Sequence, residues 1–145
     1  MKRQLAGVLV AGVIVVFGVL LTGQTPFYLT HQRLSVRGKD FTVERAVTDW
    51  QRQRGLMYRS HLAPDRGMLL AYSTVGRYGI WMHNMRLSID ALWIAADGTI
   101  IDLVQGLRPE LDAHTSTVPA MGILELPAGT VEQLGIVVGD RVDWR

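Results

Sequence analysis

The hydrophobic and polar positions divide the chain into an apolar first segment and a longer region of short apolar runs separated by turn residues. Residues 5–21 carry no charged side chain. A helix through them would be about 26 Å long at 1.5 Å per residue, close to the roughly 30 Å thickness of a membrane's hydrocarbon core. The pattern therefore predicts an N-terminal transmembrane helix followed by a strand-rich domain.

The charges around this apolar segment predict its orientation. Lys2 and Arg3 precede it, and the next basic residue is Arg33, so the positive-inside bias places the N-terminus in the cytoplasm. A cleaved signal peptide is the alternative, but residues 21–23 supply only one of the two small residues that cleavage favours. We expect a single-pass anchor in the inner or plasma membrane with a periplasmic or extracellular domain, and a cleaved, secreted form as the alternative. The expected division is an anchor or signal segment with its tether over 1–26 and an exported domain over 27–145.

The exported region begins with a strand pattern and then a helix signal. Apolar and polar residues alternate over 41–44, which is typical of a half-buried strand. Thr48 and Gln51 have the spacing of a capping box, in which both side chains bond free amides at a helix start. The helix is expected to run to about Arg54 and to end at Gly55.

The clearest hairpin signal is an Asp97-Gly98 turn between apolar runs at 89–95 and 99–104. Consecutive apolar residues in the first run predict that both faces of that strand are buried. The polar connection over 106–119 is long enough to be a lid or binding loop. Further short strands are expected at 68–72, 80–82 and 123–126. A short helix or turn is expected over 127–134, and 136–142 closes the domain through a turn at Gly139-Asp140. The expected fold is mainly β, a sandwich or barrel-like and mostly antiparallel domain with one or two short helices.

Charge and cysteine content narrow the function classes. Two of the 15 Lys and Arg residues lie in the anchor, which leaves 13 against 13 Asp and Glu. A formally neutral domain argues against nucleic acid as a partner, because such binding needs clustered positive charge. The chain has no cysteine, which excludes lipoprotein attachment and disulfides, so the hydrophobic core must hold the fold.

Several motifs together resemble a known family. They are the segments 52–59 (RQRGLMYR), 67–70 (GMLL), 81–84 (WMHN) with Asp90, 124–130 (LELPAGT) and 139–142 (GDRV). Their order is similar to that of the bacterial and archaeal DUF192 family. The resemblance implies a compact β-sandwich or barrel-like domain, often behind a signal or anchor, of unassigned biochemical function. The chain departs from the family's pattern at Gln51, His83, Met85 and Ser88, where Glu, Lys, Thr and Pro are usual.

The strongest candidate site is the 81–84 segment together with Asp90. Trp81 supplies an aromatic surface, while His83, Asn84 and Asp90 supply hydrogen-bonding groups, a combination that suits a small polar or saccharide-like ligand. In the competing interpretation Trp81 and Met82 fill the core, Asn84 caps a turn and Asp90 has a structural partner.

The arginines after the first helix could supply that structural partner. Arg54 or Arg59 would neutralise a buried Asp90, since a buried carboxylate needs a partner. Arg54, Arg59 and Arg66 are also candidates for an anion-binding rim, the alternative being that they belong to solvated faces. We therefore add Arg54 and Arg59 to the candidate ligand-binding residues.

Three further function classes stay open from the sequence. The domain could bind an envelope protein partner, or act on envelope glycans if Asp90 and Glu125 faced each other across a cleft. Methionines with His83 could bind cuprous copper, because soft thioethers select it, although core packing is the favoured interpretation of these methionines. No cofactor, zinc motif or catalytic motif is predicted, so the sequence favours a non-enzyme. The methionines concerned are Met57, Met68, Met82, Met85 and Met121.

Overall fold

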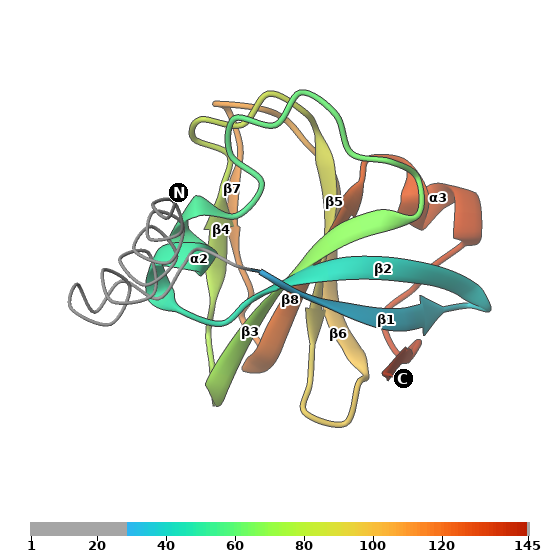
Figure 1. Ribbon diagram of the computed structural model, residues 1–145. Coiled ribbons are helices and arrows are strands. Elements are labelled where there is room, and N and C mark those ends of the chain that lie inside the picture. Colours follow the sequence, from blue (N-terminus) through green and yellow to red (C-terminus); the bar gives the residue numbers. More distant parts are fainter. Residues whose placement is uncertain (1–28, 145) are drawn as a thin grey trace, which may run out of the picture.

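The computed structural model describes residues 29–144, which form two short helices and nine strands (Figure 1). The predicted anchor lies outside the described residues. Within 29–144, no helix combines the length and apolarity needed to span a membrane. The strands are β1 (Thr30–Val36), β2 (Lys39–Ala46), β3 (Arg66–Gly76), β4 (Gly79–Trp81), β5 (Ile89–Ile94), β6 (Ile100–Leu107), β7 (Ala113–Thr115), β8 (Ala120–Pro127) and β9 (Val142–Trp144), and the helices are α2 (Asp49–Arg54) and α3 (Thr130–Leu134).

Seven strands form one curled sheet in the order β6-β5-β8-β3-β2-β1-β9. Its only parallel pair within the described chain is β2 with β3, which are joined through α2. The two edges of the sheet meet, because Thr99 just before β6 bridges Arg141 just before β9. The amide of Ile100 also donates to the carbonyl of Asp140 at 2.8 Å. The prediction of a mainly β, mostly antiparallel domain with short helices is confirmed, in the form of a curled mixed sheet.

A second, two-stranded sheet of β4 and β7 lies beside α2 (Figure 1). It packs on the convex side of the large sheet, where Ile80 and Met82 join a core with Trp93 and Ile123. The concave side encloses a separate core that draws on strands from both edges of the large sheet. All six residues of β5 are buried between these two cores, which confirms the prediction that both faces of this strand are covered.

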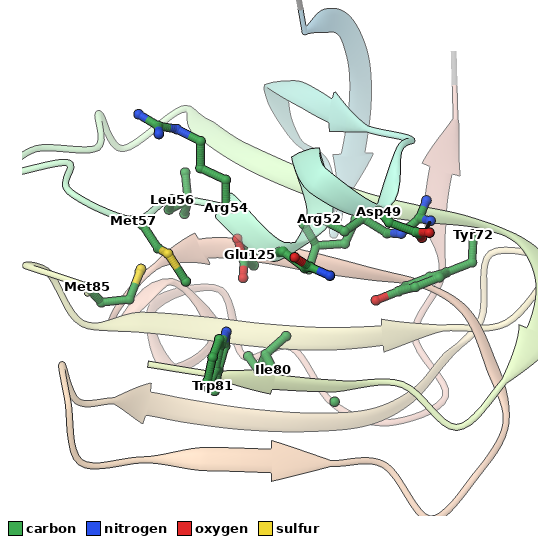
Figure 2. A pocket seen from close by; sticks show the side chains of 14 residues that line it. Asp49, Arg52, Arg54, Leu56, Met57, Tyr72, Ile80, Trp81, Met85 and Glu125 are labelled. Carbon is green, nitrogen blue, oxygen red and sulfur yellow. Dashed lines mark hydrogen bonds and ion pairs between the residues drawn. The ribbon is translucent and has the colours of Figure 1, made fainter. Parts of the chain in front are cut away.

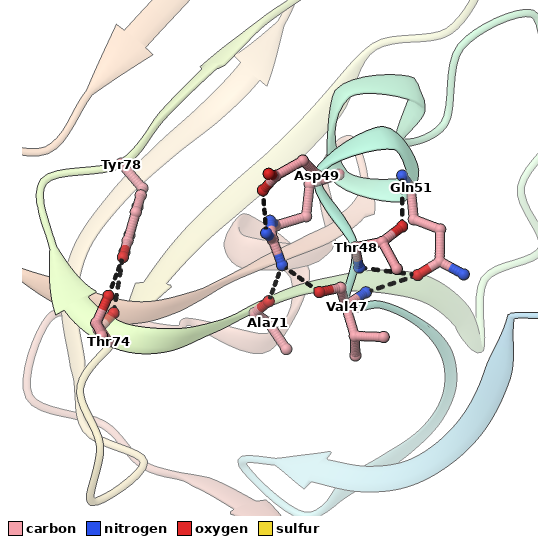
Figure 3. Close-up of polar contacts among 8 residues, drawn as sticks. Val47, Thr48, Asp49, Gln51, Ala71, Thr74 and Tyr78 are labelled. Carbon is pink, nitrogen blue, oxygen red and sulfur yellow. Dashed lines mark hydrogen bonds and ion pairs between the residues drawn. The ribbon is translucent and has the colours of Figure 1, made fainter.

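The helix signals of the sequence are confirmed. The hydroxyl of Thr48 accepts a hydrogen bond from the amide of Gln51, whose side-chain oxygen accepts from the amides of Val47 and Thr48 (Figure 3). Helix α2 then ends at Gly55, as predicted. The capping box therefore fixes where the helix begins and glycine fixes where it ends.

The β5–β6 hairpin is also confirmed, but its turn differs from the tight primed turn that Asp97-Gly98 suggests. Gly98 alone has a positive φ, 89°. The amide of Gly98 donates to the carbonyl of Ala95, and the amide of Ala95 donates to the carbonyl of Thr99. Asp97 instead accepts a hydrogen bond from the amide of Thr99. The connection is therefore a turn followed by a glycine bulge, which needs only one left-handed residue.

The 106–119 connection is part of the fold and not a free lid. Its first residues complete β6, and its later residues form β7, which pairs with β4. The amide of Met82 donates to the carbonyl of Asp112 at 3.0 Å, and the amide of Glu110 donates to the carbonyl of Met82 at 2.9 Å. These bonds fasten the connection across the end of β4.

Candidate functional site

A pocket of about 220 Å³ lies between α2 and the convex side of the sheet (Figure 2). Helix α2 and the turn after it form one wall, and β4 forms the opposite wall. In Figure 2, Met57 and Met85 lie at one end and Tyr72 at the other, with Glu125 and Trp81 between them. The lining side chains that carry chemistry are Arg52, Arg54, Met57, Tyr72, Trp81, Met85 and Glu125.

Glu125 is a buried carboxyl group that lines this pocket. It lies in β8 opposite Met68 of β3 and Ala91 of β5, so its strand neighbours are apolar. The residue is 5% exposed. Burial raises its pKa to about 7, against an opposing effect of the positive charge on Arg59. Its Oε2 atom has no hydrogen-bond partner among the described residues, which is uncommon for a buried polar atom.

Gly55 lies against this carboxyl group. A Cβ atom on Gly55 would stand 3.6 Å from Oε2 of Glu125, and Gly55 has a φ of +46°. Residues other than glycine rarely adopt that backbone conformation, because their Cβ atom clashes with the backbone. The glycine that ends α2 therefore also lets the backbone approach the carboxyl without covering it.

The arginine Arg52 holds α2 to the sheet. Its guanidinium donates to the carbonyls of Val47 and Ala71 at 2.6 and 2.8 Å and pairs with Asp49, contacts drawn in Figure 3. It also lies 4.7 Å from the ring centre of Tyr72. Arg52 therefore has a structural role in the wall of the pocket.

Arg54, a predicted site residue, lines the same pocket but its charged end lies near aromatic rings. The guanidinium carbon is 5.6 Å from the ring centre of Trp50 and 5.7 Å from that of Tyr58. In Figure 2 the side chain extends away from Glu125. Trp50 and Tyr58 are both exposed, so Arg54 forms part of an aromatic outer surface.

Trp81, the second predicted residue in the pocket, is exposed over 59% of its surface. It belongs to β4 and faces the pocket from the wall opposite α2. Its ring centre lies 5.4 Å from that of His83. The core-filling interpretation is therefore wrong for Trp81 and correct for its neighbour Met82, which is buried.

His83 and Asn84 form the turn after β4 and do not line the pocket. Nδ1 of His83 lies 3.0 Å from Oε2 of Glu110, and the amide of Asn84 donates to Oε1 of Glu110 at 2.6 Å. Asn84 has a φ of 58°, a conformation that asparagine tolerates better than most residues. Glu110, which the sequence did not single out, fixes this turn.

Asp90 has a structural role on the other side of the sheet. Its side-chain oxygens accept hydrogen bonds from the amide of Gly106 at 2.9 Å and from that of Val131 in α3 at 2.8 Å. The prediction of an arginine partner for Asp90 is therefore wrong, because two backbone amides donate hydrogen bonds to this carboxylate. Asp90 is opposite Leu126, whereas Glu125 is opposite Ala91. Neighbouring strand residues point to opposite faces, so Asp90 and Glu125 do not face each other as a glycan-hydrolysing pair would.

Arg59 does not join Arg54 in an anion-binding rim. Its guanidinium donates to both oxygens of Glu44 at 2.7 and 2.6 Å. This hydrogen-bonded pair lowers the pKa of Glu44 and raises the pKa of Arg59. Arg59 lines a separate cavity of about 160 Å³ with His31 and His61.

The methionines divide into three groups. Met68 and Met82 are buried in the convex-side core, while Met57 and Met85 line the pocket. Met121 lines a different cavity, which it shares with residues of β3 and β5. Among residues 29–144, no group of three or more His, Cys, Asp or Glu side chains is placed to hold a metal ion.

Sequence reasoning named Glu125 only as a possible catalytic partner of Asp90 and did not connect it with Gly55. The available signal was a single charged residue within the apolar run Leu124-Glu125-Leu126, since a charge there must be paired or functional. A glycine after a helix is readily explained as a cap, so its second role was hidden. Only the fold brings the two residues together.

Comparison with known families gives one match that covers the described domain. The DUF192 family, described as "Uncharacterized ACR", matches residues 32–144. A UPF0127 protein of Pyrococcus furiosus is 30% identical over 112 residues, which are 74% of this chain and 92% of that protein. A UPF0127 protein of Thermococcus sibiricus is 31% identical over 113 residues, 74% of this chain and 70% of the relative.

Two crystal structures have a similar fold. One, of a protein from Sinorhizobium meliloti 1021 described as a candidate transcription regulator, is 38% identical with a TM-score of 0.78, and the match covers 83% of this chain and 98% of that one. The other, of a protein of unknown function from Novosphingobium aromaticivorans, is 25% identical with a TM-score of 0.77, over 83% and 90% of the two chains. The first structure consists almost entirely of the matched domain, which indicates that such a domain folds by itself.

Proposed function

Because this chain belongs to the DUF192 family, we propose for its folded domain a function that the family description leaves open, the binding of a small polar ligand in the pocket between α2 and β4. The observation that carries the proposal is the unpartnered Oε2 of Glu125. A buried acceptor without a donor costs free energy. A ligand that supplies the donor would recover this cost, which makes Glu125 the anchoring group of the pocket.

The size and walls of the pocket support a small ligand with one flat or apolar face. Its volume of about 220 Å³ is below the roughly 300–1,000 Å³ of pockets for drug-sized molecules. Trp81 offers an exposed indole opposite α2. Aromatic faces stack on sugar rings and attract cations, so a saccharide-like ligand fits the same arrangement.

The cellular setting is part of the proposal. We infer from the apolar, uncharged run at 5–21 and the two basic residues before it that the domain is anchored in a membrane and faces the periplasm or cell exterior. The balance of 13 basic and 13 acidic residues after the anchor supports a partner other than nucleic acid. We therefore do not extend to this chain the description of the Sinorhizobium protein as a transcription regulator.

Cuprous copper is a second candidate ligand, favoured by one specific observation. Met57 and Met85 both line the pocket, and thioether sulfur is a preferred ligand of this ion. Replacement of both residues by leucine keeps the apolar volume and removes both sulfurs. Loss of Ag(I) binding, used as a redox-stable probe, in that double variant but not in M68L would support this candidate.

Thermal unfolding of residues 27–145 against N-acetylglucosamine, other cell-wall saccharides, amino acids and Ag(I) tests the proposal. A ligand at 100 times its dissociation constant adds about 2.7 kcal/mol of stability, which is several degrees for a domain of this size. The shift should be reduced in W81L and kept in W50L, because Trp50 is 55% exposed but does not line the pocket. A shift that survives W81L and E125Q would place binding elsewhere, and no shift from the whole panel would contradict a small-ligand site.

A further inference from the structure

We propose that the pocket takes a small organic ammonium ion, whose N–H groups donate to Glu125 and whose carbon chain packs between Met57, Met85 and Trp81. This inference rests on the proposed function, because it names the ligand class of the same site. Three properties of the pocket support it: the charges that face it, the apolar character of its other walls, and the poor fit of those walls to alternative ligands.

The positive charge of Arg59 acts on Glu125, but no cation among the described residues donates a hydrogen bond to its Oε2 atom. Arg52 is occupied by two carbonyls and Asp49. Arg54 extends toward Trp50 and Tyr58, and Arg59 is paired through both nitrogens with Glu44. A ligand that brings its own positive charge would therefore supply the hydrogen-bond donor that Oε2 lacks and a further positive charge beside this buried carboxylate.

The remaining walls are apolar and polarisable, which suits an alkylammonium ion. Leu56, Ile80 and the thioethers of Met57 and Met85 line the pocket. The indole of Trp81 offers a π face, and tryptophan is the best aromatic partner for a cation. An inorganic metal ion fits less well, since no group of three or more His, Cys, Asp or Glu side chains within 29–144 is placed to hold one.

An anionic ligand fits the pocket less well. It would lie against the buried carboxyl of Glu125, and two like charges at short range in a site of low dielectric repel strongly. The guanidinium groups that could offset this repulsion already have acceptors or aromatic partners. A neutral hydroxyl group would satisfy Oε2 without adding charge, so it is the matched comparison for the test.

The test compares n-butylammonium with 1-butanol, and adds N-acetylglucosamine as a neutral saccharide. Binding to residues 27–145 at pH 8 is followed by the NMR signals of the Trp81 indole N–H and the Gly55 amide. We expect n-butylammonium to bind at least tenfold more tightly than 1-butanol. E125Q keeps the shape of the side chain and removes its charge, so it should remove this preference.

Two further variants keep the test informative if E125Q folds poorly. W81L changes an exposed residue and should weaken n-butylammonium binding severalfold, because the π face is lost. W50L should leave the affinity unchanged, since Trp50 does not line the pocket. Two results would overturn the ammonium assignment. One is equal affinity of the wild-type domain for n-butylammonium and 1-butanol, and the other is a wild-type preference for n-butylammonium over 1-butanol in both E125Q and W81L.

The pH dependence gives an independent readout. The titratable groups that line the pocket with Glu125 are Asp49, Arg52 and Arg54 from α2 and Tyr72 from β3, and the charge of Arg59 in the following loop also acts on Glu125. The β4 residues in the wall, Gly79, Ile80 and Trp81, do not titrate. Because the carboxyl of Glu125 has a pKa of about 7, its ionised fraction and the affinity for n-butylammonium should rise about tenfold from pH 6 to pH 8. Binding below pH 7 should release a proton from Glu125 to the buffer.

The outcomes separate this inference from the proposed function. If N-acetylglucosamine shifts the Trp81 and Gly55 signals and n-butylammonium does not, the ammonium assignment is overturned while a ligand pocket remains supported. If none of the three probes shifts them, the ammonium assignment is also overturned, and the wider thermal panel decides whether the pocket binds any small ligand.

Discussion

Gly55 and Glu125 meet in the fold so closely that a Cβ atom on the glycine would lie 3.6 Å from Oε2 and 3.9 Å from Oε1 of the carboxyl group. The two residues come from the motifs at 52–59 and 124–130, which are far apart in the sequence. One motif supplies a buried acceptor, and the other supplies a backbone that leaves the acceptor uncovered. This relationship gives the pocket its chemistry.

Substitution of Gly55 should affect both stability and binding. G55A forces a side chain into a positive φ and places a methyl group against the Glu125 carboxyl, so we expect a loss of about 1 kcal/mol or more in the free energy of unfolding. G38A is the matched control, because Gly38 has a φ of +79° but a Cβ atom there would have nothing within 4 Å. Urea unfolding should show a loss in both variants, whereas only G55A should weaken n-butylammonium binding. Equal binding by the two variants would contradict the role given to Gly55.

The stability of the domain should depend on pH through Glu125. Its pKa is raised from 4.5 to about 7 in the folded state by burial, so the folded state holds this proton more tightly than the unfolded state. Stability should therefore fall as pH rises from about 4.5 to 7, by about 1.4 kcal/mol per unit and roughly 3 kcal/mol in all. E125Q should lose this slope. The check is urea unfolding of both proteins at pH 5, 6, 7 and 8, and parallel curves would contradict the raised pKa.

Glu44 should show the opposite pH dependence. The hydrogen bond from Arg59 lowers its pKa below 4.5, so the stabilisation is present above pH 4.5 and is lost as pH falls through the lowered value. The pair is partly exposed, so E44Q should cost only about 1 kcal/mol at pH 7 after solvent screening. The difference between the wild-type and E44Q unfolding free energies should shrink as pH falls from 4.5 through the lowered pKa of Glu44. A constant difference across this range would show that the pair contributes through packing instead of charge.

Asp90 should matter for stability and not for ligand binding. It accepts hydrogen bonds from two backbone amides and is 0% exposed. D90N keeps one acceptor oxygen and turns an amide group toward the second N–H, which should cost about 1–3 kcal/mol. The affinity of the folded fraction for n-butylammonium should not change. A loss of n-butylammonium binding in D90N at unchanged stability would contradict this prediction and indicate that Asp90 contributes to the ligand site.

Local features were predictable from the sequence because they depend on neighbouring residues. The capping box at Thr48, the helix end at Gly55 and the strand pair around Gly98 each rest on one short segment. The parallel pairing of β2 with β3 and the meeting of Thr99 with Arg141 bring together residues from separate segments. Such contacts leave no periodic pattern along the chain, so the sequence could not distinguish a sandwich from a curled sheet.

The candidate site was predicted in part for the same reason. Trp81 and Arg54 were identified by their chemistry and do line the pocket. Asp90 was selected as a carboxylate in a buried strand, but its side chain points to the other face from Glu125. Strand alternation fixes the relative direction of side chains only once the register between β5 and β8 is known.

The role of Glu125 can be measured directly by a carbon-13 NMR titration of its carboxyl group, assigned by comparison with E125Q, in residues 27–145 with and without n-butylammonium. We predict a pKa of about 7 for Glu125 in the free domain and a lower pKa when n-butylammonium is bound, because a nearby cation favours the ionised carboxylate. A carboxyl that titrates near 4.5, the ordinary value for glutamate, would show that Glu125 is solvated or already paired. That result would contradict its role as the anchoring group of a ligand pocket.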